Sequence, residues 1–126
     1  PVILDVAHNV EACMMLVDNL TQMPCQGKTY VVYSALQGKD VEGMIAVLKQ
    51  SSDHWFVAPL DTERGHSAAS LRQYTSDIPS THYDNIAEAY RAAMTLARPQ
   101  DRVVVCGSFF VLSAVLTVIQ EECDAD

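Results

Sequence analysis

Five short apolar runs alternate along the chain with segments whose apolar residues recur every three or four positions, as in a helix. This alternation restricts the possible folds more than any other feature. The runs are continuously apolar, as is typical of parallel strands with helices packed on both faces. We therefore expect an α/β fold with a doubly wound, mostly parallel sheet and helices on both faces. The expected strands are residues 2–4, 29–33, 54–58, the neighbourhood of 82–83, and 102–106.

Capping residues mark the starts of the expected helices. Each precedes apolar residues at helical spacing, and its side-chain oxygen can accept a hydrogen bond from a backbone N–H of the first turn. The first helix should stop near Met23 and Pro24. The last should begin after Gly107 and Ser108 and fray in its acidic end, residues 121–126. The expected caps are Asn9, Asp40, Ser67 and Asn85.

The composition limits the partners that we expect. The 126 residues include 16 Asp and Glu against 8 Lys and Arg, so the formal net charge is −8. Such a field repels phosphate backbones and anionic membranes, and we expect neither nucleic acid nor a membrane as a partner. No apolar run approaches the roughly 18 residues that cross a bilayer, and the first residues lack a signal-peptide pattern, so a cytoplasmic location is predicted. The four cysteines contain no CxxC pair, which favours free thiols over disulfides.

Ligands of parallel α/β sheets bind beyond the carboxyl ends of the strands, which directs attention to four loops at one edge. Asp5 and His8 lie three residues apart in the first loop, where a carboxylate and an imidazole can face one ligand near the N–H groups of a helix. A turn aspartate beside an exposed histidine is the simpler alternative. The four loops are residues 5–9, 34–40, 60–67 and 107–108.

Four other residues of this edge have both a functional and a structural interpretation. Ser108 can present its hydroxyl to a carboxylate or simply cap the last helix. Lys39 and Asp40 are most simply a turn lysine and a helix cap. Arg64 can hold a carboxylate or phosphate through paired hydrogen bonds, or it can stay solvated in its polar loop.

The sequence lacks the motifs of several common functions of α/β domains. No GxGxxG follows the first strand and no GxxxxGK[ST] occurs, which argues against a self-contained dinucleotide site and an autonomous P-loop nucleotidase. The last strand is not followed by the lysine of a phosphoacceptor receiver domain. His54, His66 and His82 lack the ligand spacing of a zinc site, and we expect no metal bound by this chain alone.

Four ordered motifs resemble the C-terminal domain of bacterial bifunctional dihydrofolate synthase/folylpolyglutamate synthase, in the Mur ligase superfamily, over essentially the whole chain. The resemblance implies a Rossmann-like unit of the Mur ligase C-terminal type, with residues 1–126 as a single domain. A larger N-terminal P-loop domain would precede it, and the start at Pro1 without an initiator Met agrees. Val10 departs from the proline that usually follows the first motif. The motifs are LDVAHN, SALQGKD, WFVAPLDTERG and DRVVVCGSFFV.

The resemblance also implies an activity. Such enzymes are ATP-dependent ligases that add L-glutamate to dihydropteroate or to folate (poly)glutamates through an acyl phosphate. ATP and Mg²⁺ would serve the complete enzyme, with the metal ligands mainly on the N-terminal domain. The implied partners are therefore ATP, L-glutamate, dihydropteroate or folate, and the enzyme's own N-terminal P-loop domain, over which this domain closes. We expect the isolated chain to be inactive.

Site residues are implied by the same motifs. His8 is the expected catalytic residue and also binds nucleotide together with Asp5 and Asn9, while Ser108 matches a serine that binds glutamate. Two alternatives stay open at this point. One is a stand-alone α/β module that binds a small molecule, and the other is the C-terminal domain of a Mur ligase acting on peptidoglycan precursors. Weaker candidates, without an assigned role, are Lys39, Asp40 and Arg64.

Overall fold

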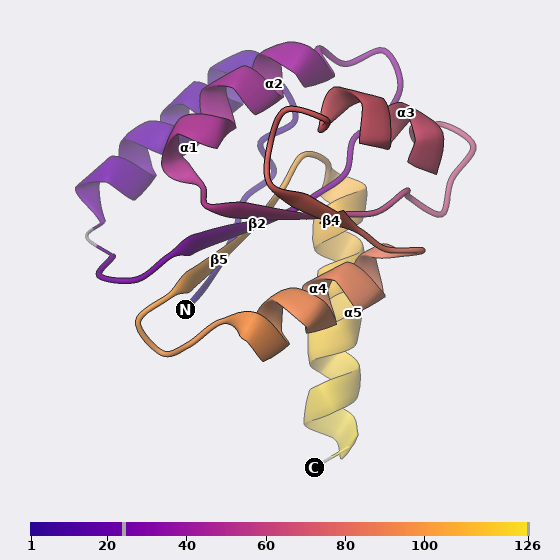
Figure 1. The fold of residues 1–126 in the computed structure, drawn as a ribbon. Coiled ribbons are helices and arrows are strands. Elements are labelled where there is room, and N and C mark those ends of the chain that lie inside the picture. The colour runs from indigo at the N-terminus through magenta and orange to yellow at the C-terminus, as the bar shows by residue number, and fades with distance from the viewer. Residues whose placement is uncertain (24, 126) are drawn as a thin grey trace.

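The computed structural model describes residues 1–23 and 25–125 and contains one five-stranded parallel sheet with the order β1-β5-β2-β3-β4 (Figure 1). The α/β fold expected from the sequence is confirmed. The elements are β1 (Val2–Leu4), α1 (Val10–Gln22), β2 (Thr29–Tyr33), α2 (Val41–Leu48), the 3₁₀ helix η1 (Lys49–Ser51), β3 (His54–Val57), α3 (Ala68–Tyr74), β4 (Ser80–His82), α4 (Ile86–Leu96), β5 (Arg102–Cys106) and α5 (Phe109–Ala125).

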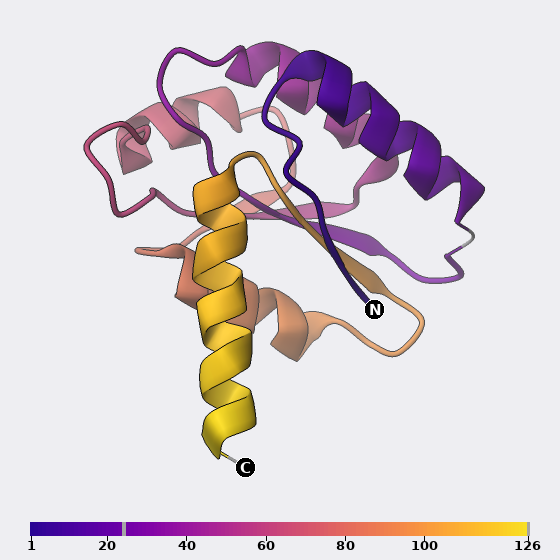
Figure 2. The same cartoon turned by 180° about the vertical axis from the view of Figure 1, so that it is seen from behind.

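Helices cover both faces of the sheet, with α1, α2 and α3 on one side and α4 and α5 on the other (Figures 1 and 2). Successive side chains of a strand point to opposite faces, so β2 supplies both cores. Val31 and Tyr33 pack with the first group of helices, and Tyr30 and Val32 pack with the second. Burial on both faces explains why the strands are continuously apolar in the sequence.

The four expected caps are all formed. In each case a side-chain oxygen accepts a hydrogen bond from a backbone N–H three residues later, at 2.8–3.1 Å. The starts of α1 to α4 therefore follow directly from local sequence. The caps and the residues that donate to them are Asn9 and Ala12, Asp40 and Gly43, Ser67 and Ser70, and Asn85 and Glu88.

Two boundaries differ from expectation. The fourth strand is Ser80–His82 and ends before Tyr83. The acidic end, expected to fray, is helical to Ala125 in this structure, and Asp126 lies outside the described residues. Interactions along and across the helix support this last stretch: Gln120 Nε2 donates to Asp124 Oδ1 at 3.2 Å, and Glu121 pairs with Arg91 at 3.7 Å. The first helix ends at Gln22 with Met23 as its C-cap, whereas Pro24 lies outside the described residues.

Within the described part of the chain, no helix combines the length and the apolar character needed to cross a bilayer. The four cysteines are free thiols.

Candidate ligand pocket at the carboxyl edge of the sheet

The loops that follow β1 and β5 are joined at the carboxyl edge of the sheet. Gly107 donates its backbone N–H to the carbonyl of Ala7 at 2.8 Å. Gly107 has φ +107°, and a Cβ there would collide with the carbonyl of Ser34 and the ring of Tyr33. Only glycine suits this position, because both the conformation and the close approach exclude a side chain.

These loops and the loop after β2 surround a small cavity of about 100 Å³, here called the edge pocket. It contains three residues that the sequence singled out, His8, Lys39 and Ser108, which come from three separate loops. Their convergence depends on β5 lying between β1 and β2 in the sheet. The edge pocket is lined by His8, Leu36, Lys39, Gly107, Ser108, Phe109 and Phe110.

The orientation of the His8 ring follows from the neighbouring helix cap. Asn9 Oδ1 accepts the N–H of Ala12 at 2.8 Å, which directs the amide nitrogen of Asn9 to within 3.4 Å of His8 Nδ1. An amide nitrogen only donates, so this contact favours the neutral tautomer of His8 that accepts at Nδ1 and carries its hydrogen on Nε2. Nε2–H is therefore the group that His8 can offer to a ligand.

Ser108 combines both interpretations given to it. Its carbonyl accepts the N–H of Val111 at 3.1 Å, and its Oγ accepts the N–H of Phe110 at 3.1 Å, so it starts α5. The residue is only 2% exposed, yet it lines the edge pocket. In the described residues its hydroxyl hydrogen has no acceptor. Ser108 thus keeps one donor for a ligand after satisfying the helix.

Asp5 lies at the base of the same edge, but outside the lining of the pocket. Its backbone N–H donates to the carbonyl of Val105 at 3.0 Å and its Oδ1 accepts the N–H of Ala7 at 2.8 Å. Among residues 1–23 and 25–125, no group donates to Oδ2. One oxygen therefore shapes the loop, and the other remains as an acceptor.

Two buried thiols lie close to Asp5. Burial, and then the negative charge of Asp5, raise the pKa of Cys13 to about 11. Burial is also the main reason why the pKa of Cys106 lies well above its ordinary value, with the charges of Cys13 and Asp5 adding to the effect. Both groups stay protonated at neutral pH, so neither provides a thiolate nucleophile.

The three weaker candidates, Lys39, Asp40 and Arg64, have different positions in the structure. Asp40 caps α2 through its bond to the N–H of Gly43 at 2.9 Å, as its structural interpretation predicted. Arg64 stays outside the edge pocket, although its carbonyl accepts the N–H of Gln37 at 2.7 Å and so fixes the loop that carries Lys39. Of these three candidates only Lys39 lines the pocket.

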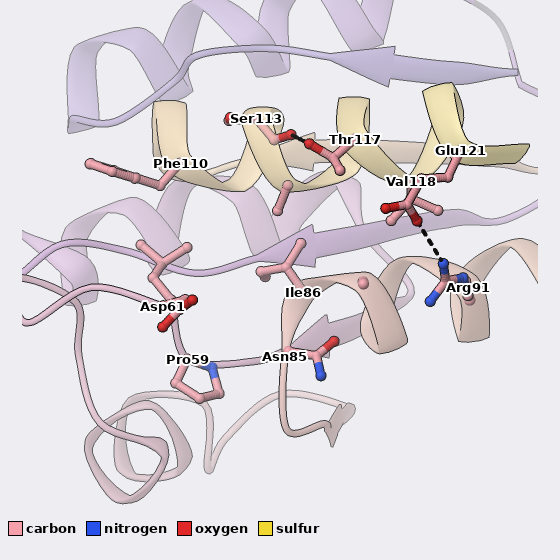
Figure 3. Close-up of a pocket in the computed structure, with 13 residues that line it drawn as sticks. Pro59, Asp61, Asn85, Ile86, Arg91, Phe110, Ser113, Thr117, Val118 and Glu121 are labelled. Atoms are coloured by element: carbon pink, nitrogen blue, oxygen red, sulfur yellow. Dashed lines mark hydrogen bonds and ion pairs between the residues drawn. The ribbon is translucent and has the colours of Figure 1, made fainter. Parts of the chain in front are cut away.

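A larger groove of about 400 Å³ runs between α4 and α5 (Figure 3). It contains the ion pair of Arg91 and Glu121, whose side chains are 50% and 64% exposed, and it reaches Asp61 in the loop after β3. Phe110 lines both this groove and the edge pocket. The groove is larger than the edge pocket, but the edge pocket holds three of the residues that the sequence singled out for binding, His8, Lys39 and Ser108. Sequence reasoning missed the groove, because nothing in local sequence brings residues 91 and 121 together.

The fold and the edge pocket define a parallel α/β domain with a candidate ligand site at the carboxyl ends of its strands. Residues 1–109 match the family described as Mur ligase, glutamate ligase domain, and the chain belongs to this family. The resemblance drawn from the four motifs is confirmed.

Two bacterial proteins are similar to this chain over more than nine-tenths of its length. The dihydrofolate synthase/folylpolyglutamate synthase of Escherichia coli K12 is 39% identical over 118 residues, which are 94% of this chain and 28% of that protein. The protein of the same name from Buchnera aphidicola (subsp. Schizaphis graminum) is 33% identical over 93% of this chain and 28% of its own length. The chain thus spans less than a third of these relatives.

Solved structures agree with this fold. The Yersinia pestis bifunctional folylpolyglutamate synthase/dihydrofolate synthase, complexed with AMPPNP and Mn, superimposes with a TM-score of 0.88 at 39% identity, covering 94% of this chain and 28% of that one. The E. coli FolC protein in complex with DHPP and ADP gives a TM-score of 0.90 at 37% identity, covering 96% and 29%. A bifunctional synthase with Mn, AMPPNP and L-glutamate bound gives 0.87 at 39% identity, covering 94% and 29%.

Proposed function

We propose that this chain is the C-terminal domain of an ATP-dependent ligase that joins L-glutamate to dihydropteroate, to folate glutamates, or to both. One observation carries the proposal: in a chain of this family, His8 and Ser108 come from opposite ends of the sequence and line one pocket. Relatives of this name and solved structures that hold a nucleotide or L-glutamate support it. They also favour a folate acceptor over a peptidoglycan precursor.

In the proposed reaction ATP transfers its terminal phosphoryl group to a carboxylate of the acceptor. The amine of glutamate then attacks the acyl phosphate, forms the amide bond, loses a proton and releases phosphate. An enzyme accelerates such a reaction chiefly by holding the amine in line with the acyl carbon, by neutralising phosphate charge and by excluding water. These are tasks for a domain that closes over the reacting groups.

We assign the roles as follows. Asp5 Oδ2 accepts a hydrogen bond from a ribose hydroxyl of the nucleotide. His8 is the catalytic residue and donates through Nε2–H to a phosphate oxygen, and Ser108 donates its hydroxyl hydrogen to glutamate. Asn9 belongs to the nucleotide-binding loop, where it sets the His8 tautomer through the contact at 3.4 Å.

The proposal includes a larger N-terminal P-loop domain that precedes this chain and binds the triphosphate. Since the chain spans only 28% of the E. coli relative, most of such an enzyme lies elsewhere. Within residues 1–23 and 25–125, no three His, Cys, Asp or Glu side chains gather as metal ligands. We assign the Mg²⁺ ligands mainly to the preceding domain, as the family resemblance implies. A cytoplasmic location is part of the proposal, because the reaction consumes ATP.

The test is an acceptor comparison with the complete enzyme. ADP release should depend on glutamate and on either dihydropteroate or a reduced folate, and a peptidoglycan precursor should give none. Ser108→Ala should lower kcat/KM for glutamate by about 10-fold or more, because a hydrogen bond to a charged group is lost. Ser76→Ala is the matched control, because Ser76 is exposed and does not line the edge pocket. Release that needs a peptidoglycan precursor instead would overturn the folate assignment.

A further inference from the structure

The α5 side of the groove between α4 and α5 is one continuous stripe of side chains (Figure 3). Its members recur every three or four residues, so they share one face of the helix. From residue 110 to residue 121 the stripe has a length of about 16 Å at the rise of an α-helix. A groove of this length suits a helical segment better than a compact metabolite. The stripe consists of Phe110, Ser113, Ala114, Thr117, Val118 and Glu121.

The base and walls of this groove are mainly apolar. Ile86 and Val118 line it and are only 4% and 2% exposed, so they lie at its base. Leu60 and Phe110 form walls, and Phe110 is 42% exposed. The volume of about 400 Å³ lies within the range of about 300–1,000 Å³ that is typical of binding pockets. The groove therefore offers apolar surface that a partner can bury.

The charged side chains of the groove are mostly acidic. Asp61 lies toward the Phe110 end and Glu121 toward the other (Figure 3). Among the residues that the structure describes, Asp61 takes part in no ion pair. The cation of the lining, Arg91, is already paired with Glu121 at 3.7 Å. The lining thus carries unmatched negative charge.

The end of α5 adds to this negative charge. Its last turns contain Glu121, Glu122 and Asp124, and no Lys or Arg occurs in α5. Carboxylates there face the negative end of the helix dipole, an unfavourable arrangement that a nearby cation offsets. In both overall views these turns extend beyond the sheet and α4 (Figures 1 and 2). Within residues 1–23 and 25–125, Glu122 and Asp124 have no cationic partner.

These features favour one kind of partner. A basic amphipathic helix can place an apolar stripe in the groove while its Lys and Arg side chains reach the carboxylates at both ends. A second copy of this chain is disfavoured, because α5 has no Lys or Arg to face the carboxylates of the other copy. The same carboxylates repel nucleic acid and anionic membranes.

We propose that the groove between α4 and α5 is a docking surface for a basic amphipathic helix of another polypeptide. The apolar residues of that helix cover Ile86, Phe110 and Val118, and its cations pair with Asp61 and with the acidic end of α5. The proposal goes beyond the ligase function and does not depend on it, because its test measures binding and not ADP release.

The probe is a fluorescent synthetic peptide of about 18 residues, long enough to form a helix, with Leu at helical spacing and Lys at the other positions. Fluorescence anisotropy with the complete protein measures its affinity, beside a matched peptide that carries Glu in place of Lys. The Lys peptide should bind at least about 10-fold more tightly than the Glu peptide, and added salt should weaken it. Equal affinity for the two peptides, or binding of neither, would overturn the proposal.

Two substitutions with matched controls test whether the peptide lies in the groove. Ser113→Trp fills the groove from an exposed position and should weaken binding of the Lys peptide by about 10-fold or more, whereas Asn19→Trp, on the exposed face of α1, should change it less than about 2-fold. Asp61→Lys should also weaken binding by about 10-fold. Asp18→Lys, at an exposed position of α1, gives the same net charge and should have little effect.

Two further results would contradict the proposal. Equal effects of Asp61→Lys and Asp18→Lys would show that the peptide responds to net charge alone. A dimer of the protein in sedimentation that Ser113→Trp abolishes would assign the groove to a second copy. If Ser113→Trp lowers the melting temperature, Asp61→Lys, at an exposed loop position, decides the question alone.

Discussion

The backbone N–H of Gly107 and the carbonyl of Ala7 form a hydrogen bond of 2.8 Å that joins the two loops carrying Ser108 and His8. The bond lies at the carboxyl edge, between neighbouring strands β1 and β5. It makes the spacing of the two candidate site residues a property of the backbone. The turn itself needs glycine at position 107 because φ is +107° and a Cβ would collide with the carbonyl of Ser34.

Gly107→Ala should destabilise the domain by about 3 kcal/mol or more, since left-handed backbone strain adds to a collision with Ser34 and Tyr33. Gly38→Ala is the matched comparison: φ is +84°, but a Cβ there meets nothing within 4 Å, so the cost should be only about 1–2 kcal/mol. Urea unfolding measures both free energies. Equal losses in the two variants would contradict the role of the close approach.

Asp101 connects two loops at the opposite edge of the sheet. Its carboxylate accepts the N–H of Lys28 at 2.7 Å and the N–H of Arg98 at 2.8 Å, and these backbone bonds hold its pKa below the ordinary value. The resulting stability is present above the unfolded pKa of about 3.9 and is lost as pH falls through the lower folded value.

Asp101→Asn should therefore lower the melting temperature at pH 7 and weaken the loss of stability below about pH 4, because the titrating group is gone. Thermal unfolding across pH 2.5 to about 7 measures both effects. Asp18→Asn, on the exposed side of α1, is the control and should leave the melting temperature close to wild type. A similar effect of both substitutions would show that the two backbone contacts contribute nothing particular.

His82 should make stability depend on pH near neutrality. Burial, followed by the charge of Arg72, lowers its pKa, while Nε2 lies 2.9 Å from Thr75 Oγ1. A lowered pKa means that the unfolded chain binds the proton more readily, so this stability is full above about pH 6.5 and declines below it. His82→Gln keeps a donor toward Thr75 and should flatten the pH dependence of chemical denaturation between about pH 7.5 and 5. An unchanged slope would show that His82 does not contribute.

The four thiols should react in two groups. Cys123 is exposed and Cys25 is partly exposed, whereas Cys13 and Cys106 are fully buried with raised pKa values. A thiol reagent at pH 7–8 should modify about two cysteines quickly in the native domain and all four after denaturation. Rapid native labelling of Cys106 would contradict the packing beneath the edge pocket.

Local sequence predicted most of the fold, because its signals act over short distances. Asn9, Asp40, Ser67 and Asn85 each bond a backbone N–H three residues later, and the apolar runs mark strands buried on both faces. The end of α5 was not predictable in this way. Its support includes the pair of Glu121 with Arg91, which belongs to another helix.

The sequence predicted at which edge of the sheet the candidate site lies, but it predicted less well which residues line the pocket there. Parallel topology places all the loops after strands together, but strand order decides which loops touch. Because β5 lies between β1 and β2, His8, Lys39 and Ser108 share a pocket that Arg64, in the loop after β3, does not line. The apolar walls from Leu36 and Phe109 carried no chemical signal in the sequence.

The most direct test of the central claim is glutamate-dependent ADP release by the complete enzyme, wild type against His8→Ala, with dihydropteroate or a reduced folate as acceptor. We predict release by the wild type that rises with glutamate concentration and falls by about 100-fold in the variant, the scale of losing a group that acts on the transferring phosphate. Full activity of His8→Ala would contradict the placement of the active site at this edge. No glutamate-dependent release by the wild type would contradict the ligase assignment itself.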